Sequence, residues 1–87
     1  MPAVFIPALL EPLAGGRRVV PVEGATVGEA IDNLERACPG IRERLLDGGR
    51  LRAGVSVAVD GEIAAGGLRE PVSPSSEIHF VVAIRGG

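Results

Sequence analysis

Hydrophobic residues recur at the strand period of about two residues at the start of this chain, at the helical period of about 3.6 in the middle, and at the strand period again near the end. The apolar run 4–10 reads as a first strand, with Val4 and Ile6 on one face and Phe5 on the other. A Gly-Gly turn and the β-branched segment 17–22 follow it. Together they predict two antiparallel strands joined by a loop.

The next segment, 27–38, has hydrophobic residues at the helical period, which predicts a helix packed on one side. Thr26 and Glu29 form a T-x-x-E capping box, and Pro39-Gly40 ends the segment. The apolar stripe consists of Val27, Ala30, Ile31, Leu34, Ala37 and Cys38. We expect the charged residues between them to face solvent, namely Asp32, Glu35 and Arg36.

The second half of the chain returns to short elements. Residues 41–46 predict one further helical turn, and 55–59 predict a strand with its valines toward the helix. Asp60-Gly61 is a two-residue turn signal. The Gly- and Pro-marked segment 64–76 is predicted to be a loop with one short strand near Leu68.

The last predicted strand, 77–84, is the longest, which favours a central position. The order hairpin, helix, strand, turn, strand predicts an α+β fold, a mixed sheet of four to five strands with one main helix packed on one face. Right-handed crossover makes the first and last strands parallel neighbours, which is the β-grasp (ubiquitin-like) arrangement. The other sheet face stays uncovered, and there we place Phe5, His79 and Val81 as a candidate docking surface.

Composition restricts the class further. The 87 residues suit a single domain spanning 1–87. The net charge is −2, and the basic residues are scattered without interleaved aromatics, so neither nucleic acid nor an anionic membrane is expected as a partner. No leader or membrane-spanning pattern is evident, and the single cysteine excludes an internal disulfide, so we expect a cytoplasmic protein.

Conventional catalytic candidates are few. Cys38 closes the apolar stripe and is expected to pack, and His79 has no evident carboxylate or serine partner for a dyad. The turn accounts for Asp60 and Glu62. Phosphate-binding loops and metal-ligand spacings are lacking, so we expect no enzyme activity, no metal site and no cofactor bound by this chain.

The C-terminus remains, where the last strand runs directly into Gly86-Gly87. We expect residues 84–87 to form a flexible tail that reaches ~13 Å when extended, at ~3.3 Å per residue. An enzyme that adenylates the Gly87 carboxylate must draw this tail into a narrow channel, and Gly86 supplies clearance because it has no Cβ. A sulfur nucleophile can then displace the adenylate to give a thiocarboxylate. Arg85 is a further candidate for partner contact.

The whole chain resembles the ThiS/MoaD-type sulfur carriers, ubiquitin-like proteins that end in Gly-Gly. Within that family the segments 5–10 and 40–47, the Gly-Gly turn and the Gly86-Gly87 end are similar to CysO-type carriers. Arg85 is a departure, because many relatives have a small or apolar residue there.

The resemblance implies a set of partners. An E1-like adenylyltransferase of the MoeB/ThiF type would use ATP and Mg²⁺ to activate Gly87. A sulfurtransferase or sulfide source would load sulfur, and a downstream synthase would accept it. In the cysteine branch, which the resemblance favours, a JAMM-type metalloprotease would release the product. Molybdopterin, thiamin or another thio-metabolite remains open as the destination.

Two other functions use the same features. The chain could be a ubiquitin-like modifier conjugated to lysines of target proteins, although it has no lysine of its own to accept a sibling copy. It could also be a plain β-grasp interaction domain with an inert tail. Deleting Gly86-Gly87 tests the interaction-domain hypothesis, because a protein with an inert tail would keep its function.

Overall fold

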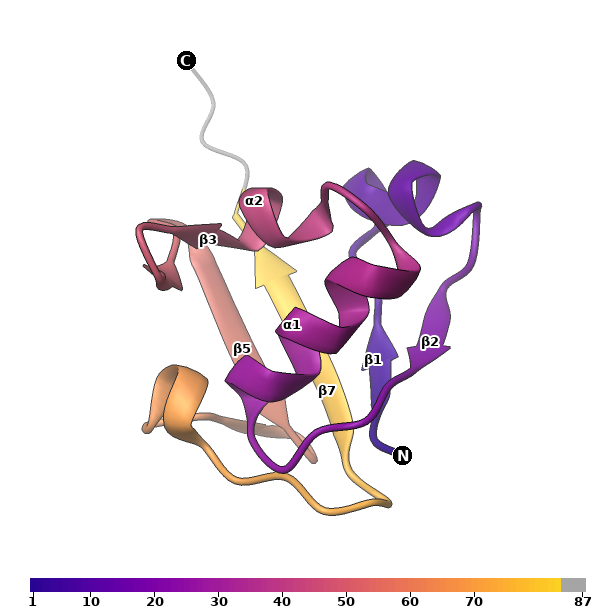
Figure 1. The fold of residues 1–87 in the computed structure, drawn as a ribbon. Coiled ribbons are helices and arrows are strands. Elements are labelled where there is room, and N and C mark those ends of the chain that lie inside the picture. The colour runs from indigo at the N-terminus through magenta and orange to yellow at the C-terminus, as the bar shows by residue number, and fades with distance from the viewer. Residues whose placement is uncertain (84–87) are drawn as a thin grey trace.

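A five-stranded mixed sheet in the order β2-β1-β7-β5-β6 organises the computed structural model, which describes residues 1–83 (Figure 1). A separate two-stranded sheet pairs β3 with β4. The elements are β1 (Ala3–Phe5), η1 (Ala8–Ala14, a 3₁₀ helix), β2 (Val19–Pro21), α1 (Val27–Ala37), α2 (Ile41–Leu45), β3 (Leu46–Asp47), β4 (Arg50–Leu51), β5 (Val55–Val59), β6 (Glu62–Ile63), η2 (Gly67–Arg69, also 3₁₀) and β7 (Glu77–Val82).

The strand pairing confirms the predicted β-grasp arrangement. β1 pairs antiparallel with β2 and parallel with β7, and β7 pairs antiparallel with β5. β7 therefore occupies the centre of the sheet, as its length indicated. The predicted turn at Asp60-Gly61 joins β5 to β6, with both residues at positive φ (51° and 86°). The β-grasp is thus shown by the register itself.

The first strand is shorter than the run 4–10 predicted. It ends at Phe5, and residues 8–14 form η1 instead, starting after Pro7 with a 2.8 Å hydrogen bond from the Leu10 amide to the Pro7 carbonyl. Pro7 cannot donate to a sheet ladder, whereas its fixed φ suits the start of a helix. Leu10 is buried all the same, from a helical turn.

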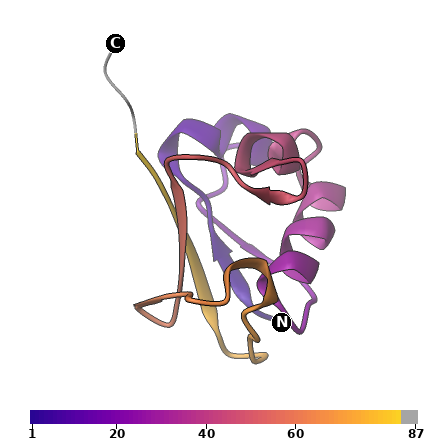
Figure 2. The same ribbon diagram turned by 90° about the vertical axis from the view of Figure 1, so that its left-hand side faces the viewer.

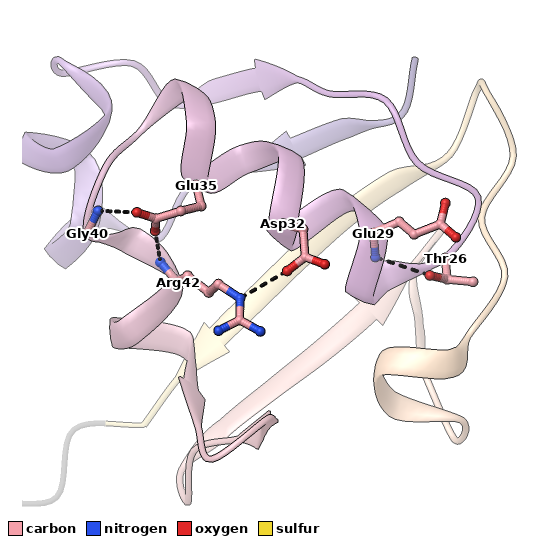
Figure 3. A network of polar contacts seen from close by, with 6 residues as sticks. All are labelled: Thr26, Glu29, Asp32, Glu35, Gly40 and Arg42. Atoms are coloured by element: carbon pink, nitrogen blue, oxygen red, sulfur yellow. Dashed lines mark hydrogen bonds and ion pairs between the residues drawn. The ribbon is translucent and has the colours of Figure 1, made fainter.

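α1 matches its prediction closely, with two differences. The Thr26 hydroxyl accepts a 3.1 Å hydrogen bond from the Glu29 amide, and Cys38 follows the last helical residue (Figure 3). Ala37, predicted in the buried stripe, is exposed, whereas Cys38 directly after it is fully buried. Glu35, predicted to be solvated, is half-buried and accepts hydrogen bonds from the amides of Gly40 and Arg42, at 2.9 and 2.8 Å (Figure 3).

The structure also corrects two segments of the second half. The predicted turn at 41–46 is α2, but the glycines after it form a hairpin between β3 and β4 rather than a loose loop. Gly48 and Gly49 supply its two positive φ angles, 60° and 80°. The short strand expected near Leu68 is the 3₁₀ turn η2, and the strand of this region is β6, directly after the turn.

The hydrophobic core lies between the sheet and α1. Ile78 and Val57 from the sheet and Ile31 and Leu34 from the helix are almost fully buried. Figure 2 shows α1 and α2 on the same side of the sheet. The opposite side carries no helix of the described residues, so the side chains that β1, β5 and β7 direct there meet solvent.

Candidate functional site

The open face of the sheet carries a continuous row of side chains. Direct cross-strand partners share a face, and the registers of the sheet link one residue from each of its five strands. In sheet order the row is Val19, Phe5, His79, Ala58 and Ile63. We call these five residues together with Val81 the open-face row. Phe5, His79 and Val81, predicted for this face, are therefore brought together on it.

The centre of the open-face row is an aromatic stack. The rings of Phe5 and His79 lie with centroids 4.0 Å apart and an interplanar angle of 13°. His79 Nε2 also lies 3.3 Å from a Glu77 carboxylate oxygen at the exposed surface. The stack and this polar contact fix the imidazole against the sheet. Within residues 1–83 the His79 ring contacts Phe5 and Glu77, and Ser56 lies on the same face as the cross-strand partner of Val81.

The ends of the open-face row are apolar and exposed. Val19, Ile63 and Val81 are 41%, 69% and 57% exposed, and they account for three of the five large exposed hydrophobic residues in 1–83. β-branched residues suit a strand wherever they point, but their gathering on one uncovered face leaves apolar surface in water. Covering such a face with another protein is favourable, because it removes apolar surface from water.

The described part of the chain ends directly after the central strand. β7 ends at Val82, and the Ala83 amide donates a 2.7 Å hydrogen bond to the Gly54 carbonyl. The predicted tail 84–87, and with it Arg85, Gly86 and Gly87, lies outside the described residues. Val81, two residues before Ala83, belongs to the open-face row, so the last described residues connect the row to the tail along one strand.

The other polar candidates serve the fold. Cys38 is fully buried, with its Sγ 3.7 Å from an Arg17 guanidinium nitrogen, which confirms the predicted packing. Asp60 accepts hydrogen bonds from the Ser76 hydroxyl and the Glu77 amide, at 3.1 and 2.9 Å. Within residues 1–83 no three metal-binding side chains gather, and no helix there is long and apolar enough to cross a membrane.

Comparisons with known proteins agree with this geometry. The model of the ThiS family matches residues 4–87. The chain is 35% identical to the sulfur carrier protein CysO of Mycobacterium tuberculosis, over 97% of this chain and 96% of that protein. The CysO of Mycobacterium bovis shows the same identity and coverage.

Solved structures are similar over the full fold. A chain in the crystal structure of the Amycolatopsis orientalis BexX/CysO complex is 34% identical, with a TM-score of 0.94 and complete coverage of both chains. M. tuberculosis CysO gives a TM-score of 0.91 at 32% identity, covering 97% of this chain and 100% of that one. SAMP1 from Haloferax volcanii gives 0.82 at 32% identity, covering 99% and 98%.

Proposed function

Because this chain belongs to the ThiS family, we propose that it acts as a sulfur carrier whose Gly87 carboxylate is adenylated and then converted to a thiocarboxylate. The observation that supports the proposal most is the joining of a Gly-Gly terminus to the central strand of a β-grasp sheet. The chain is then a protein cosubstrate that binds no cofactor itself, and ATP and Mg²⁺ belong to its activating enzyme.

The proposed chemistry takes place in two steps. The Gly87 carboxylate attacks the α-phosphate of ATP and forms an acyl-adenylate with release of pyrophosphate. A sulfide nucleophile then attacks the acyl carbon and expels AMP, leaving the thiocarboxylate. Activation is needed because a carboxylate is a poor electrophile. Gly86 and Gly87 suit a narrow enzyme channel because neither has a Cβ.

The proposed partners follow from this division of labour. An E1-like adenylyltransferase of the MoeB/ThiF type activates the tail, a sulfurtransferase or sulfide source loads it, and a synthase accepts the sulfur. We propose that the open-face row docks these enzymes through Phe5, His79 and Val81, with Arg85 contributing from the tail. The occurrence of a similar chain in the BexX/CysO complex supports docking onto another protein.

The test is an intact-mass measurement. The full chain is incubated with its activating enzyme, ATP, Mg²⁺ and sulfide, and the expected product is heavier by the exchange of one oxygen for sulfur. Deleting Gly87 abolishes this gain, whereas Gly86→Ala slows it because a Cβ enters the channel. An unchanged mass with an enzyme that activates another carrier in the same assay rules the proposal out.

We propose the cysteine branch as the destination, on the strength of the likeness to CysO carriers. The purified thiocarboxylate is offered in parallel to a cysteine synthase with activated serine and to a molybdopterin synthase large subunit. In the cysteine branch the thiocarboxylate sulfur displaces the leaving group of the activated serine, and the acyl group then shifts from sulfur to the amine, so the chain gains a C-terminal cysteine. Release of that cysteine by a JAMM-type metalloprotease, which regenerates the carboxylate, identifies this branch. Sulfur transfer only to the pterin precursor assigns the chain to the molybdopterin branch.

A second function is supported by the likeness to the H. volcanii small archaeal modifier protein 1, at 31% identity and a TM-score of 0.81. The same adenylate can be attacked by a lysine amine of a target protein, which gives a stable amide. Heavier adducts that survive denaturation and disappear when Gly87 is deleted identify conjugation. The nine basic residues are all arginine, so any adduct joins this chain to another protein and not to a lysine of a sibling copy.

A further inference from the structure

A groove unrelated to the open-face row lies between two loops that are distant in the sequence. The β3–β4 hairpin forms one wall and the segment around η2 forms the other, and both lie toward the viewer in Figure 2. The groove has a volume of about 630 Å³ and is lined by Gly49, Arg50, Leu51, Ala65, Gly66, Gly67, Leu68 and Arg69.

The floor of the groove is apolar and its walls are low. Leu51 and Leu68 are half-buried and pack against the core on the helix side of the sheet. Ala65, Gly66 and Gly67 offer no side chain beyond a methyl group, so the space above the leucines stays open. An apolar floor with exposed backbone beside it suits an extended peptide that presents an apolar side chain.

The rim of the groove is positive. Arg50 and Arg69 are exposed, and within residues 1–83 neither guanidinium forms an ion pair or a side-chain hydrogen bond. Asp47 is the cross-strand neighbour of Arg50 but makes no ion pair with it there. Glu70 is engaged by the Gly66 amide at 3.1 Å. Two guanidinium groups thus remain available to a carboxylate-bearing ligand.

We propose that this groove binds a short acidic and apolar segment of a second protein. A leucine or aromatic side chain of that segment rests on Leu51 and Leu68, and carboxylates on either side pair with Arg50 and Arg69. A nucleic acid fits less well, because two cations over an apolar floor do not form a phosphate-tracking stripe and the net charge is −2.

The groove and the open-face row are separate surfaces of the protein. The groove belongs to the helix side of the sheet and the open-face row to the other, so both surfaces can be occupied at once. A protein held at the groove would keep the carrier beside an enzyme that handles the tail. Binding at the groove requires neither Gly86 nor Gly87, so it stands or falls separately from the proposed function.

The test is a titration of the ¹⁵N-labelled full chain followed by amide chemical shifts, since the chain has no tryptophan or tyrosine for fluorescence. The probe is a capped hexapeptide that alternates aspartate with leucine. We expect saturable chemical-shift changes at the amides of Gly49, Gly66 and Gly67. Added salt should weaken the affinity for the peptide, because it screens the exposed arginines. The combined variant R50E/R69E should raise Kd by about tenfold, the effect of roughly 1.4 kcal/mol.

Matched variants and peptides make the result decisive. Arg36→Glu reverses another exposed arginine, on α1, and should leave Kd within about twofold, as distant surface changes do. Ala65→Phe, which fills the groove without changing charge, should also weaken binding while the remaining amide shifts report an intact fold. Equal binding of a lysine–leucine peptide, shifts confined to the open-face row, or no saturable shift would each overturn the proposal.

Discussion

Three polar side chains near the ends of α1 show how single residues set this fold. The Thr26 hydroxyl caps the first turn (Figure 3), and a Glu29 carboxylate oxygen accepts a 3.0 Å hydrogen bond from the Ala25 amide. At the other end Glu35 joins α1 to α2 through the amides of Gly40 and Arg42. The exposed Arg42–Asp32 pair, at 2.9 Å, adds little because solvent screens it.

Thr26→Ala should destabilise the protein by about 1 kcal/mol, because the Glu29 amide loses its acceptor. In a domain of this size the loss corresponds to a fall in Tm of roughly 4–8 °C, read by thermal denaturation followed by circular dichroism. Thr26→Ser keeps the hydroxyl and serves as the control. An equal fall in Tm for both variants would show that the hydroxyl contributes no cap.

Glu35 should make stability depend on pH. Hydrogen bonds from the Gly40 and Arg42 amides to its carboxylate hold the pKa of Glu35 below its ordinary value of 4.5. A folded-state pKa below the unfolded one gives stability that is fully present above the unfolded pKa and lost as pH falls through the folded pKa. Urea unfolding of wild type and Glu35→Gln should therefore differ most near neutrality and converge in acid. A difference in the free energy of unfolding that stays constant with pH would show that the charge of Glu35 is not the cause.

At the scale of elements, short connections decide where the strands lie. Asp60 stands at a positive φ in the β5–β6 turn and also binds the first residues of β7 through Ser76 and Glu77. One carboxylate thus aligns the edge hairpin with the central strand. At the other edge η1 connects β1 to β2 and buries Leu10 and Ala14 in the core.

Asp60→Ala should cost about 1–3 kcal/mol, because the Ser76 hydroxyl is nearly buried and loses its charged acceptor. Glu62→Ala, two residues further along the same turn and exposed, should change the free energy of unfolding by less than about 0.5 kcal/mol. Chemical denaturation measures both. Similar losses would indicate that the turn as a whole, and not the carboxylate, is responsible.

At the scale of the whole molecule, the sheet separates a covered side from an open one. α1 and α2 bury one face, while the open-face row keeps exposed valine and isoleucine side chains around the Phe5–His79 stack. The groove between the β3–β4 hairpin and η2 adds a second, positively rimmed surface. The proposed carrier role uses the open-face row and the tail, so the groove remains free to bind another protein.

Val81→Gln should lower kcat/KM for activation by about tenfold, since burying a valine side chain at an interface contributes roughly 1.5–3 kcal/mol. Its stability should stay near that of wild type, because Val81 is 57% exposed. Ala37→Gln places the same amide on the exposed end of α1 and should leave kcat/KM unchanged. Thiocarboxylate formation at limiting enzyme concentration measures the effect, and equal rates for both variants would exclude the open face from docking.

The length of the last predicted strand determined the central place of β7. The periodicity of the sequence by itself determined α1 and the identity of the uncovered face, because helical and strand periods assign side chains to faces locally. It did not determine η1, the β3–β4 hairpin or η2. These short segments have little intrinsic preference, and their conformation depends on burying Leu10, Leu46 and Leu68 against a core assembled from distant parts of the chain. Tertiary structure alone therefore stacked Phe5 on His79 and brought Arg50 and Arg69 to one groove.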